Sequence, residues 1–159
     1  MRRRHLLAVP AAALLVLGPL GGGALAAPPL TVSGESQVIE FLPDRELTED
    51  VQRFDAISQT VALDDHFAMT TTSDLSCVGS TRSFVCHGST EAVGTFDGDP
   101  AGQIARTAFR CDFRTLLCKG HNIITGGSGA LEGTRGLTRF EAHASTGEGT
   151  YTSKIIGLE

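Results

Sequence analysis

The sequence predicts an all-β protein, an antiparallel β-barrel of about eight short strands, with a β-sandwich as the alternative. Three observations lead to this prediction. Short runs of alternating apolar and polar residues recur along most of the chain. Glycine-rich and Asp-Gly turn signals separate these runs at close intervals. Four cysteines lie among the runs, so short disulfides are available to fasten neighbouring strands.

The first 26 residues have the pattern of a secretory signal peptide. Three arginines at residues 2–4 precede an apolar segment at 6–20, and small residues at 24 and 26 suit a cleavage site. The apolar segment is shorter than the roughly 20 residues of a membrane span. We therefore expect export, by the general or the twin-arginine route, and a single secreted domain of residues 27–159 with no membrane span.

The charge of this expected mature chain is negative. Once the three leading arginines are removed, 10 Lys and Arg face 18 Asp and Glu, for a net charge of −8. A nucleic-acid partner requires clustered positive charge, and anionic lipid surfaces require the same. We therefore expect no nucleic-acid partner.

Seven strands can be placed by alternation and turn signals. Phe-Asp-Gly-Asp-Pro-Ala-Gly, residues 96–102, is the clearest turn. The segment 43–54, PDRELTEDVQRF, fits either a short helix or a charged loop, and an eighth strand is expected within 43–55 or 70–82. The predicted strands are 29–41, 56–69, 82–96, 103–112, 116–125, 135–145 and 149–157.

The four cysteines predict two disulfides. The local pairs Cys77–Cys86 and Cys111–Cys118 are favoured, because each encloses polar turn residues and can close a hairpin. Pairing of Cys86 with Cys111 is the alternative, since the turn at 96–102 can place their strands side by side. The absence of a CxxC pair argues against a zinc site and against redox catalysis. No metal and no cofactor are predicted.

The glycine-rich segment IITGGSGALEGTRG, residues 123–136, has the composition of a phosphate-binding loop but not its spacing. No Gly-Lys-Ser/Thr follows, and the third glycine of a dinucleotide fingerprint is replaced by Glu132. A structural corner is predicted instead. In it Gly126, Gly127 and Gly129 supply positive φ angles. The turn then directs Leu131 inward, and Gly133 and Gly136 allow close approach of the chain to its neighbours.

This corner carries a family resemblance. The string IITGGSGALEGTRGLTRFEA, together with Thr-Phe before an Asp/Gly turn and RTAFR at 106–110, resembles β-barrels of the allene oxide cyclase and dirigent type. The resemblance is greater to their secreted bacterial relatives of unknown function, and it covers roughly residues 56–157. It implies an eight-stranded antiparallel barrel with a small interior. No catalytic residue of the plant enzymes can be transferred, so catalytic residues are unknown.

The best candidate ligand-binding residues are Arg139, Glu141 and His143. They alternate with apolar residues, so a strand projects all three from one face. Together they are suited to acid–base chemistry or to holding a small anion. The favoured alternative is an exposed ladder of cross-strand polar pairs.

These observations predict a secreted, non-enzymatic barrel that binds a small apolar ligand or an envelope or extracellular partner. The sequence contains no catalytic motif, and enzyme activity is left open rather than excluded. An isomerase or cyclase that acts on an apolar small molecule in the barrel interior is the first alternative, supported only by the resemblance. A secreted inhibitor-like interaction module is the second.

Overall fold

A computed structural model describes residues 27–48, 51–63 and 66–158, with backbone alone at 41–48 and 51–63. Over these residues the chain forms eight antiparallel strands that close into one barrel in sequence order. The fold class predicted from the sequence is confirmed. The strands are β1 (Leu30–Thr48), β2 (Val51–Leu63), β3 (Phe67–Gly79), β4 (Ser83–Phe96), β5 (Asp99–Asp112), β6 (Leu117–Gly129), β7 (Arg135–His143) and β8 (Glu148–Ile156).

The long first strand closes the barrel by pairing on two sides. Its beginning pairs with β8 from Leu30↔Ile155 onward, and its second half pairs with β2 as far as Thr48↔Val51. A register shift interrupts the β1–β2 ladder between Val38 and Glu40. Because every strand therefore has two partners, the fold leaves no open sheet edge between β8 and β1.

The structure corrects the predicted elements in the first half of the chain. The described residues of the segment 43–54, which are 43–48 and 51–54, are neither a helix nor a loop, because they are paired in the β1–β2 ladder. The predicted strand 56–69 covers the end of β2 and the beginning of β3, so it is not one strand. The segment 70–82 holds most of β3, so the eighth strand expected within 43–55 or 70–82 lies in the second of these segments.

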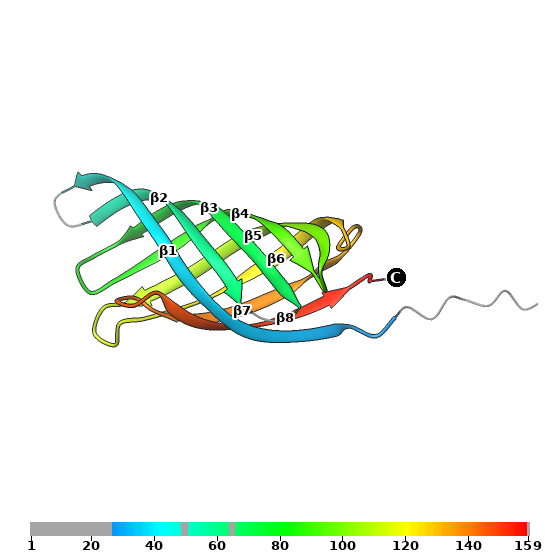
Figure 1. The fold of residues 1–159 in the computed structure, drawn as a ribbon. Coiled ribbons are helices and arrows are strands. Elements are labelled where there is room, and N and C mark those ends of the chain that lie inside the picture. The colour runs from blue at the N-terminus through cyan, green and yellow to red at the C-terminus, as the bar shows by residue number, and fades with distance from the viewer. Residues whose placement is uncertain (1–26, 49–50, 64–65, 159) are drawn as a thin grey trace, which may run out of the picture.

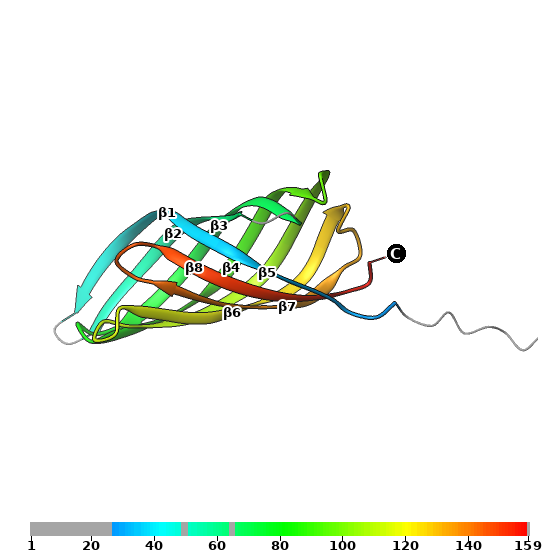
Figure 2. The same ribbon diagram turned by 60° about the horizontal axis from the view of Figure 1, so that its bottom comes forward.

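The connections divide between the two ends of the barrel (Figure 1). The hairpins β1–β2, β3–β4, β5–β6 and β7–β8 lie at one end, which we call the disulfide end. The β4–β5 turn, the β6–β7 connection and the C-terminus lie at the other, which we call the corner end. The strands cross the barrel at a steep tilt, as closure of eight strands requires (Figure 2).

The turn between β4 and β5 is tighter than predicted. Asp97 and Gly98 have φ angles of 51° and 88°, and they alone connect the pair Phe96↔Asp99. Positive φ at both central residues gives the twist that a two-residue hairpin needs, which is why Asp-Gly suits this position. The remaining residues of the predicted turn, 99–102, belong to β5.

Both predicted local disulfides are present. Cys77 and Cys86 are directly opposite each other on β3 and β4, and so are Cys111 and Cys118 on β5 and β6. Each bond thus fastens one hairpin at the disulfide end. Disulfides of this kind are typical of an oxidising, extracytoplasmic environment. The predicted signal peptide, residues 1–26, lies outside the described residues.

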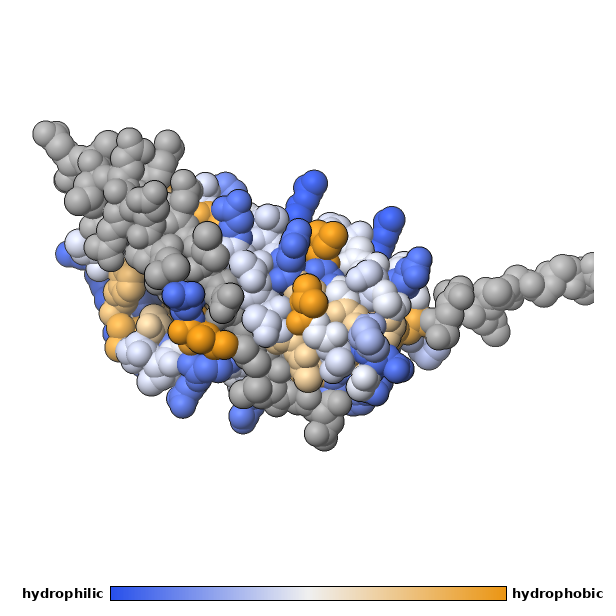
Figure 3. Space-filling view, turned by 45° about the horizontal axis from the view of Figure 1, so that its top comes forward, coloured by the Kyte–Doolittle hydropathy of each residue, from blue (hydrophilic) through white to orange (hydrophobic). Residues whose placement is uncertain are grey.

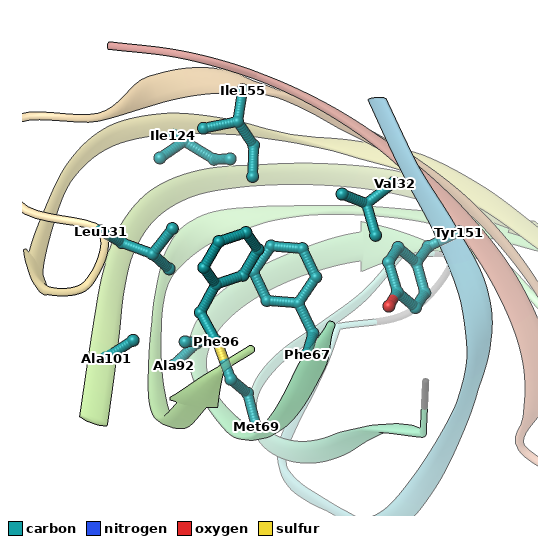
Figure 4. Close-up of a cluster of buried hydrophobic side chains, with 10 residues drawn as sticks. All are labelled: Val32, Phe67, Met69, Ala92, Phe96, Ala101, Ile124, Leu131, Tyr151 and Ile155. Atoms are coloured by element: carbon teal, nitrogen blue, oxygen red, sulfur yellow. The ribbon is translucent and has the colours of Figure 1, made fainter. Parts of the chain in front are cut away.

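An apolar cluster fills the corner end of the barrel. Phe67, Phe96 and Leu131 meet there, with the two phenylalanine rings 5.0 Å apart between centroids (Figure 4). Leu131 and Ile155, both members of this cluster, are fully buried. The full set of buried members is Val32, Phe67, Met69, Ala92, Phe96, Ala101, Ile124, Leu131, Tyr151 and Ile155.

The β6–β7 corner brings Leu131 into this cluster. Two glycines of the corner have positive φ, Gly129 at 60° and Gly133 at 73°, whereas Gly126 and Gly127 continue β6 and do not. At Gly127 the reason for glycine is space, because a Cβ would lie 2.0 Å from the Leu131 carbonyl oxygen. That same oxygen accepts a hydrogen bond from the Thr134 hydroxyl at 2.6 Å. The corner therefore holds its one large side chain inward.

The outer wall is polar with scattered apolar residues. Figure 3 shows isolated hydrophobic side chains among hydrophilic ones on the face it presents. Among the side chains that the structure describes, Val93 is the most exposed large apolar one at 71%, followed by Ile39 and Ile104. Single exposed apolar side chains are normal on soluble surfaces. No helix among the described residues is long and apolar enough to cross a membrane.

Candidate functional site

A cavity of about 420 Å³ occupies the barrel interior between the corner-end cluster and the disulfide end. Phe67, Met69 and Tyr151 line it on the side of the corner-end cluster. At the other side its lining includes Phe113 and Ala144, which are exposed, so the cavity reaches the surface at the disulfide end. Cavities of this volume suit small organic ligands, for which the range is roughly 300–1,000 Å³.

A belt of uncharged polar side chains crosses the middle of this cavity. It takes one residue from each of the six strands β3 to β8, and neighbouring members are opposite or diagonal to each other in the ladders. All six line the cavity. We call this set the polar belt; its members are Ser73, Thr90, Thr107, Asn122, Thr138 and Ser153.

Hydroxyl groups within the belt bond to one another. Thr90 connects Ser73, at 2.8 Å between oxygens, with Thr107 in a short hydrogen bond. Thr138 and Ser153 bond across β7 and β8 at 2.9 Å. Hydroxyls can donate and accept at once, so such chains satisfy polar groups in a buried setting. The belt therefore places hydrogen-bonding groups inside the barrel without placing a charge there.

Two amide atoms at the cavity have no such partner. Gln103 Nε2 and Asn122 Oδ1 are buried and make no hydrogen bond to any described residue. Both residues line the cavity. A buried donor or acceptor left without a partner costs about 1–3 kcal/mol, so natural interiors seldom keep one without a use.

Aromatic rings surround the cavity at the disulfide end. The Phe84 ring lies 5.2 Å from that of Phe113 and 6.1 Å from that of Phe109, and Phe109 lies 6.1 Å from Phe140. All four line the cavity, and we call them the phenylalanine mouth. Tilted and edge-to-face pairs at these distances are the favoured arrangement of aromatic side chains. The Cys111–Cys118 disulfide also lines the cavity beside them.

The described part of the lining is almost free of charge. Among the cavity residues whose side chains are described there is no Asp, Glu, Lys or Arg, and His143 and Tyr151 are the titratable members. An ion that enters such a site loses its hydration and gains no partner of opposite charge, which is strongly unfavourable. The lining therefore suits an uncharged ligand.

The three residues predicted as a ligand site are not gathered in this cavity. Arg139 and Glu141 are exposed on the outer wall of β7. Glu141 pairs with Lys119, its direct neighbour on β6, at 2.6 Å between Oε2 and Nζ. This is the cross-strand polar pairing described above as the favoured alternative. His143, at the end of β7, lines the cavity rim, and its Nδ1 is 2.9 Å from Ser145 Oγ. Ligand binding by these residues stays a prediction.

Sequence reasoning missed the polar belt. Thr107 and Asn122 face inward, yet their strands also carry polar residues on the outer face, such as Arg106 and His121. Alternation identifies a buried face only when that face is apolar. The signal that remains is the recurrence of one small polar residue near the middle of each successive strand, and it becomes visible once the register is known. No group of three His, Cys, Asp or Glu suited to a metal ion occurs in the described part of the chain.

Comparison with solved structures identifies a similar fold. The crystal structure of a protein of unknown function from the DUF3224 family, from Shewanella oneidensis MR-1, matches with a TM-score of 0.64 and 13% sequence identity. The match covers 82% of this chain and 98% of that protein. No protein-family model and no curated protein matches the sequence. The resemblance to allene oxide cyclase and dirigent barrels is not confirmed, and the similarity to the Shewanella protein establishes a shared barrel fold alone.

Proposed function

We propose that this protein is an exported, non-enzymatic binding protein that holds a small uncharged organic ligand inside its barrel. The observation that carries the proposal is the cavity of about 420 Å³, whose described lining contains no Asp, Glu, Lys or Arg. Aromatic and aliphatic side chains supply the apolar contact area, and the polar belt supplies directional hydrogen bonds. Ligand sites generally combine a mainly apolar wall with a few placed polar groups.

The negative charge of the mature chain supports the same choice of ligand. With a net charge of −8 over residues 27–159, the surface repels anions before they reach the cavity. Inside, the described lining offers an anion no fixed positive charge. The two disulfides support export, because such bonds persist outside the cytoplasm.

A matched pair of fluorescent probes tests the proposal. N-phenyl-1-naphthylamine is uncharged, and 8-anilinonaphthalene-1-sulfonate has the same ring system with a sulfonate. We expect the uncharged probe to bind the purified, disulfide-intact protein saturably with one site, and the sulfonate to bind at least about tenfold more weakly, since it gives up its hydration without a partner. Absence of saturable binding by the uncharged probe, or equal binding of the sulfonate, contradicts the proposal.

A pair of variants locates the probe. Ala142→Phe adds a ring to the cavity wall, whereas Thr150→Phe adds one to the exposed outer wall of the adjacent strand β8. The first is expected to abolish or strongly weaken binding and the second to leave it unchanged, with circular dichroism as the check on folding. Equal effects of both substitutions would place the probe outside the barrel.

An isomerase or cyclase of the allene oxide cyclase or dirigent type is the second candidate. It is favoured by one observation, that His143 and Tyr151 both line the cavity and are able to exchange protons. Mass spectrometry distinguishes the candidates once a natural ligand is recovered. A binding protein returns the ligand unchanged after prolonged incubation, and an enzyme converts it in a manner that His143→Gln abolishes.

A further inference from the structure

The two unpartnered amide atoms and the phenylalanine mouth are at different depths of the cavity. Gln103 is directly opposite Ala92, a member of the corner-end cluster, so it is the deep polar group. Asn122 is opposite Thr107 and Thr138, in the middle of the polar belt. Phe109 follows two residues after Thr107 on β5, toward the disulfide end. The order from the surface inward is therefore rings, belt amide and deep amide.

The spacing of these groups defines a ligand length. Phe109 and Gln103 are six residues apart on β5, about 20 Å along the strand. In an eight-stranded barrel tilted by about 35–45° this corresponds to about 15 Å along the axis. Both side chains occupy part of that span, so the remaining length suits one ring system with a short polar group at its end.

The unpartnered atoms define the polar group. Gln103 Nε2 is a donor and requires an acceptor, such as a carbonyl oxygen. Asn122 Oδ1 is an acceptor and requires an N–H or O–H. A hydrocarbon of the same shape removes water from both amides and returns no hydrogen bond. A carboxylate can accept from Gln103 but has no donor for Asn122, and it introduces a charge where the described lining offers no Lys or Arg side chain of opposite charge.

We propose that the cavity is specific for an uncharged aromatic compound that carries both a hydrogen-bond acceptor and a donor, of which an aryl carboxamide is the simplest class. The ring occupies the phenylalanine mouth, and the polar group bonds to Gln103 and Asn122. This inference rests on the proposed ligand-binding function and adds the chemistry of the ligand to it.

Three naphthalenes of matched shape test this inference on the purified, disulfide-intact protein. They are 2-naphthamide, its hydrocarbon analogue 2-isopropylnaphthalene and its anionic analogue 2-naphthoate. Affinities are measured by displacement of N-phenyl-1-naphthylamine. The quantity to compare between variants is the ratio of the amide's affinity to the hydrocarbon's affinity. The hydration free energy of each free compound is the same for every variant, so it cancels in this comparison. The naphthoate is expected to bind at least about tenfold more weakly than the amide.

The key variant is Gln103→Met, which keeps the side-chain length and removes the donor. We expect the amide-to-hydrocarbon ratio to fall about tenfold, the value of a lost hydrogen bond in a buried site. Asn122→Leu is expected to lower the ratio in the same direction. The melting temperature of ligand-free Gln103→Met should not fall, because the substitution removes a buried donor that has no described partner.

Gln37→Met is the matched control. Gln37 Nε2 donates to the carbonyl oxygens of Thr146 at 2.8 Å and Val38 at 3.1 Å, so this glutamine is already satisfied by the protein. Its replacement should lower the melting temperature and leave the ligand ratio unchanged. This is the result expected for a glutamine with a purely structural role. For Gln103→Met we expect the reverse, a ligand ratio that falls and a melting temperature that does not.

The ring end is tested separately. Phe113→Ala should lower the affinities for the amide and for the hydrocarbon by the same factor, so that the ratio of the two affinities is preserved. Leu116→Ala, in the same turn, should change neither affinity. Leu116 is a suitable control because it is comparably exposed and does not line the cavity.

The outcomes separate this inference from the proposed function. A ratio unaffected by Gln103→Met, or a naphthoate that binds as well as the amide, overturns the inference while ligand binding stands. Failure of every uncharged naphthalene to bind overturns both. A ratio that falls in Gln103→Met and Asn122→Leu, and is preserved in Gln37→Met, supports the inference.

Discussion

Replacement of Leu131 by Ala tests whether the β6–β7 corner closes one end of the barrel. Leu131 has no solvent exposure and packs in the cluster that contains Phe96 and Ile155. Its main chain is fixed by neighbours, since its N–H donates to the Ser128 carbonyl at 3.2 Å and its own carbonyl accepts from Thr134. The surrounding structure is therefore poorly able to collapse into the space that the side chain leaves.

The magnitude follows from this geometry. Leu→Ala removes three buried carbon groups, worth about 2.4 kcal/mol at about 0.8 kcal/mol each, and an uncollapsed cavity adds to this cost. We therefore expect a loss of roughly 3–4 kcal/mol in the free energy of unfolding. With a urea m-value of about 1.5 kcal/mol/M, the unfolding midpoint should fall by about 2 M.

Urea denaturation followed by circular dichroism measures this loss, and Glu132→Gln is the matched control. Glu132 is the next residue in the same corner and is exposed, so its change should remain within about 0.5 kcal/mol. Gly127→Ala should also destabilise, because the new Cβ would lie 2.0 Å from the Leu131 carbonyl oxygen. A loss below about 1 kcal/mol for Leu131→Ala would refute the conclusion that this side chain closes the barrel.

Three further predictions concern other parts of the barrel. Thr90→Val should cost about 1–3 kcal/mol in chemical denaturation, because it breaks the buried hydroxyl chain and deprives Ser73 of its partner; an unchanged midpoint would show that the chain adds nothing to stability. Joint replacement of Cys77 and Cys86 by Ala should lower the free energy of unfolding by about 2.5 kcal/mol, the loop-closure value for so short a loop. Calorimetry under oxidising conditions checks this, and equal melting temperatures of the variant and the unmodified protein would contradict it. Leu116→Gly should raise the unfolding free energy by about 1 kcal/mol, because the residue has a φ of 55° that glycine adopts without a Cβ clash; a lower melting temperature would argue against that backbone conformation.

The parts of the fold that could be predicted are those with local signals. The disulfide pairs follow from polar turn residues between close cysteines, and the β4–β5 turn follows from Asp97-Gly98. The segment 43–54 had no such signal. Leu47, Val51 and Phe54 have a spacing that fits one helical face, and the backbone instead pairs this segment as a hairpin ladder. A hairpin gains its stability from cross-strand partners, which the spacing within one short segment does not show.

The candidate site could not be predicted for a different reason. Charged residues such as Arg139 and Glu141 are the usual candidates for a site in a sequence, but here they lie on the outer wall. The residues that line the cavity are serines, threonines and amides that look the same in the sequence whether they face water or the interior. Their common inward direction depends on the register of six strands, and a slip of one residue would reverse it.

The central claim, that the barrel interior is the binding site, is tested most directly by a backbone NMR titration with 2-naphthamide. Saturable shifts are expected at Gln103, Thr107, Phe109 and Asn122, with one common dissociation constant. Shifts confined to outer-wall residues such as Glu141, or no saturable shift at any residue, would contradict binding inside the barrel.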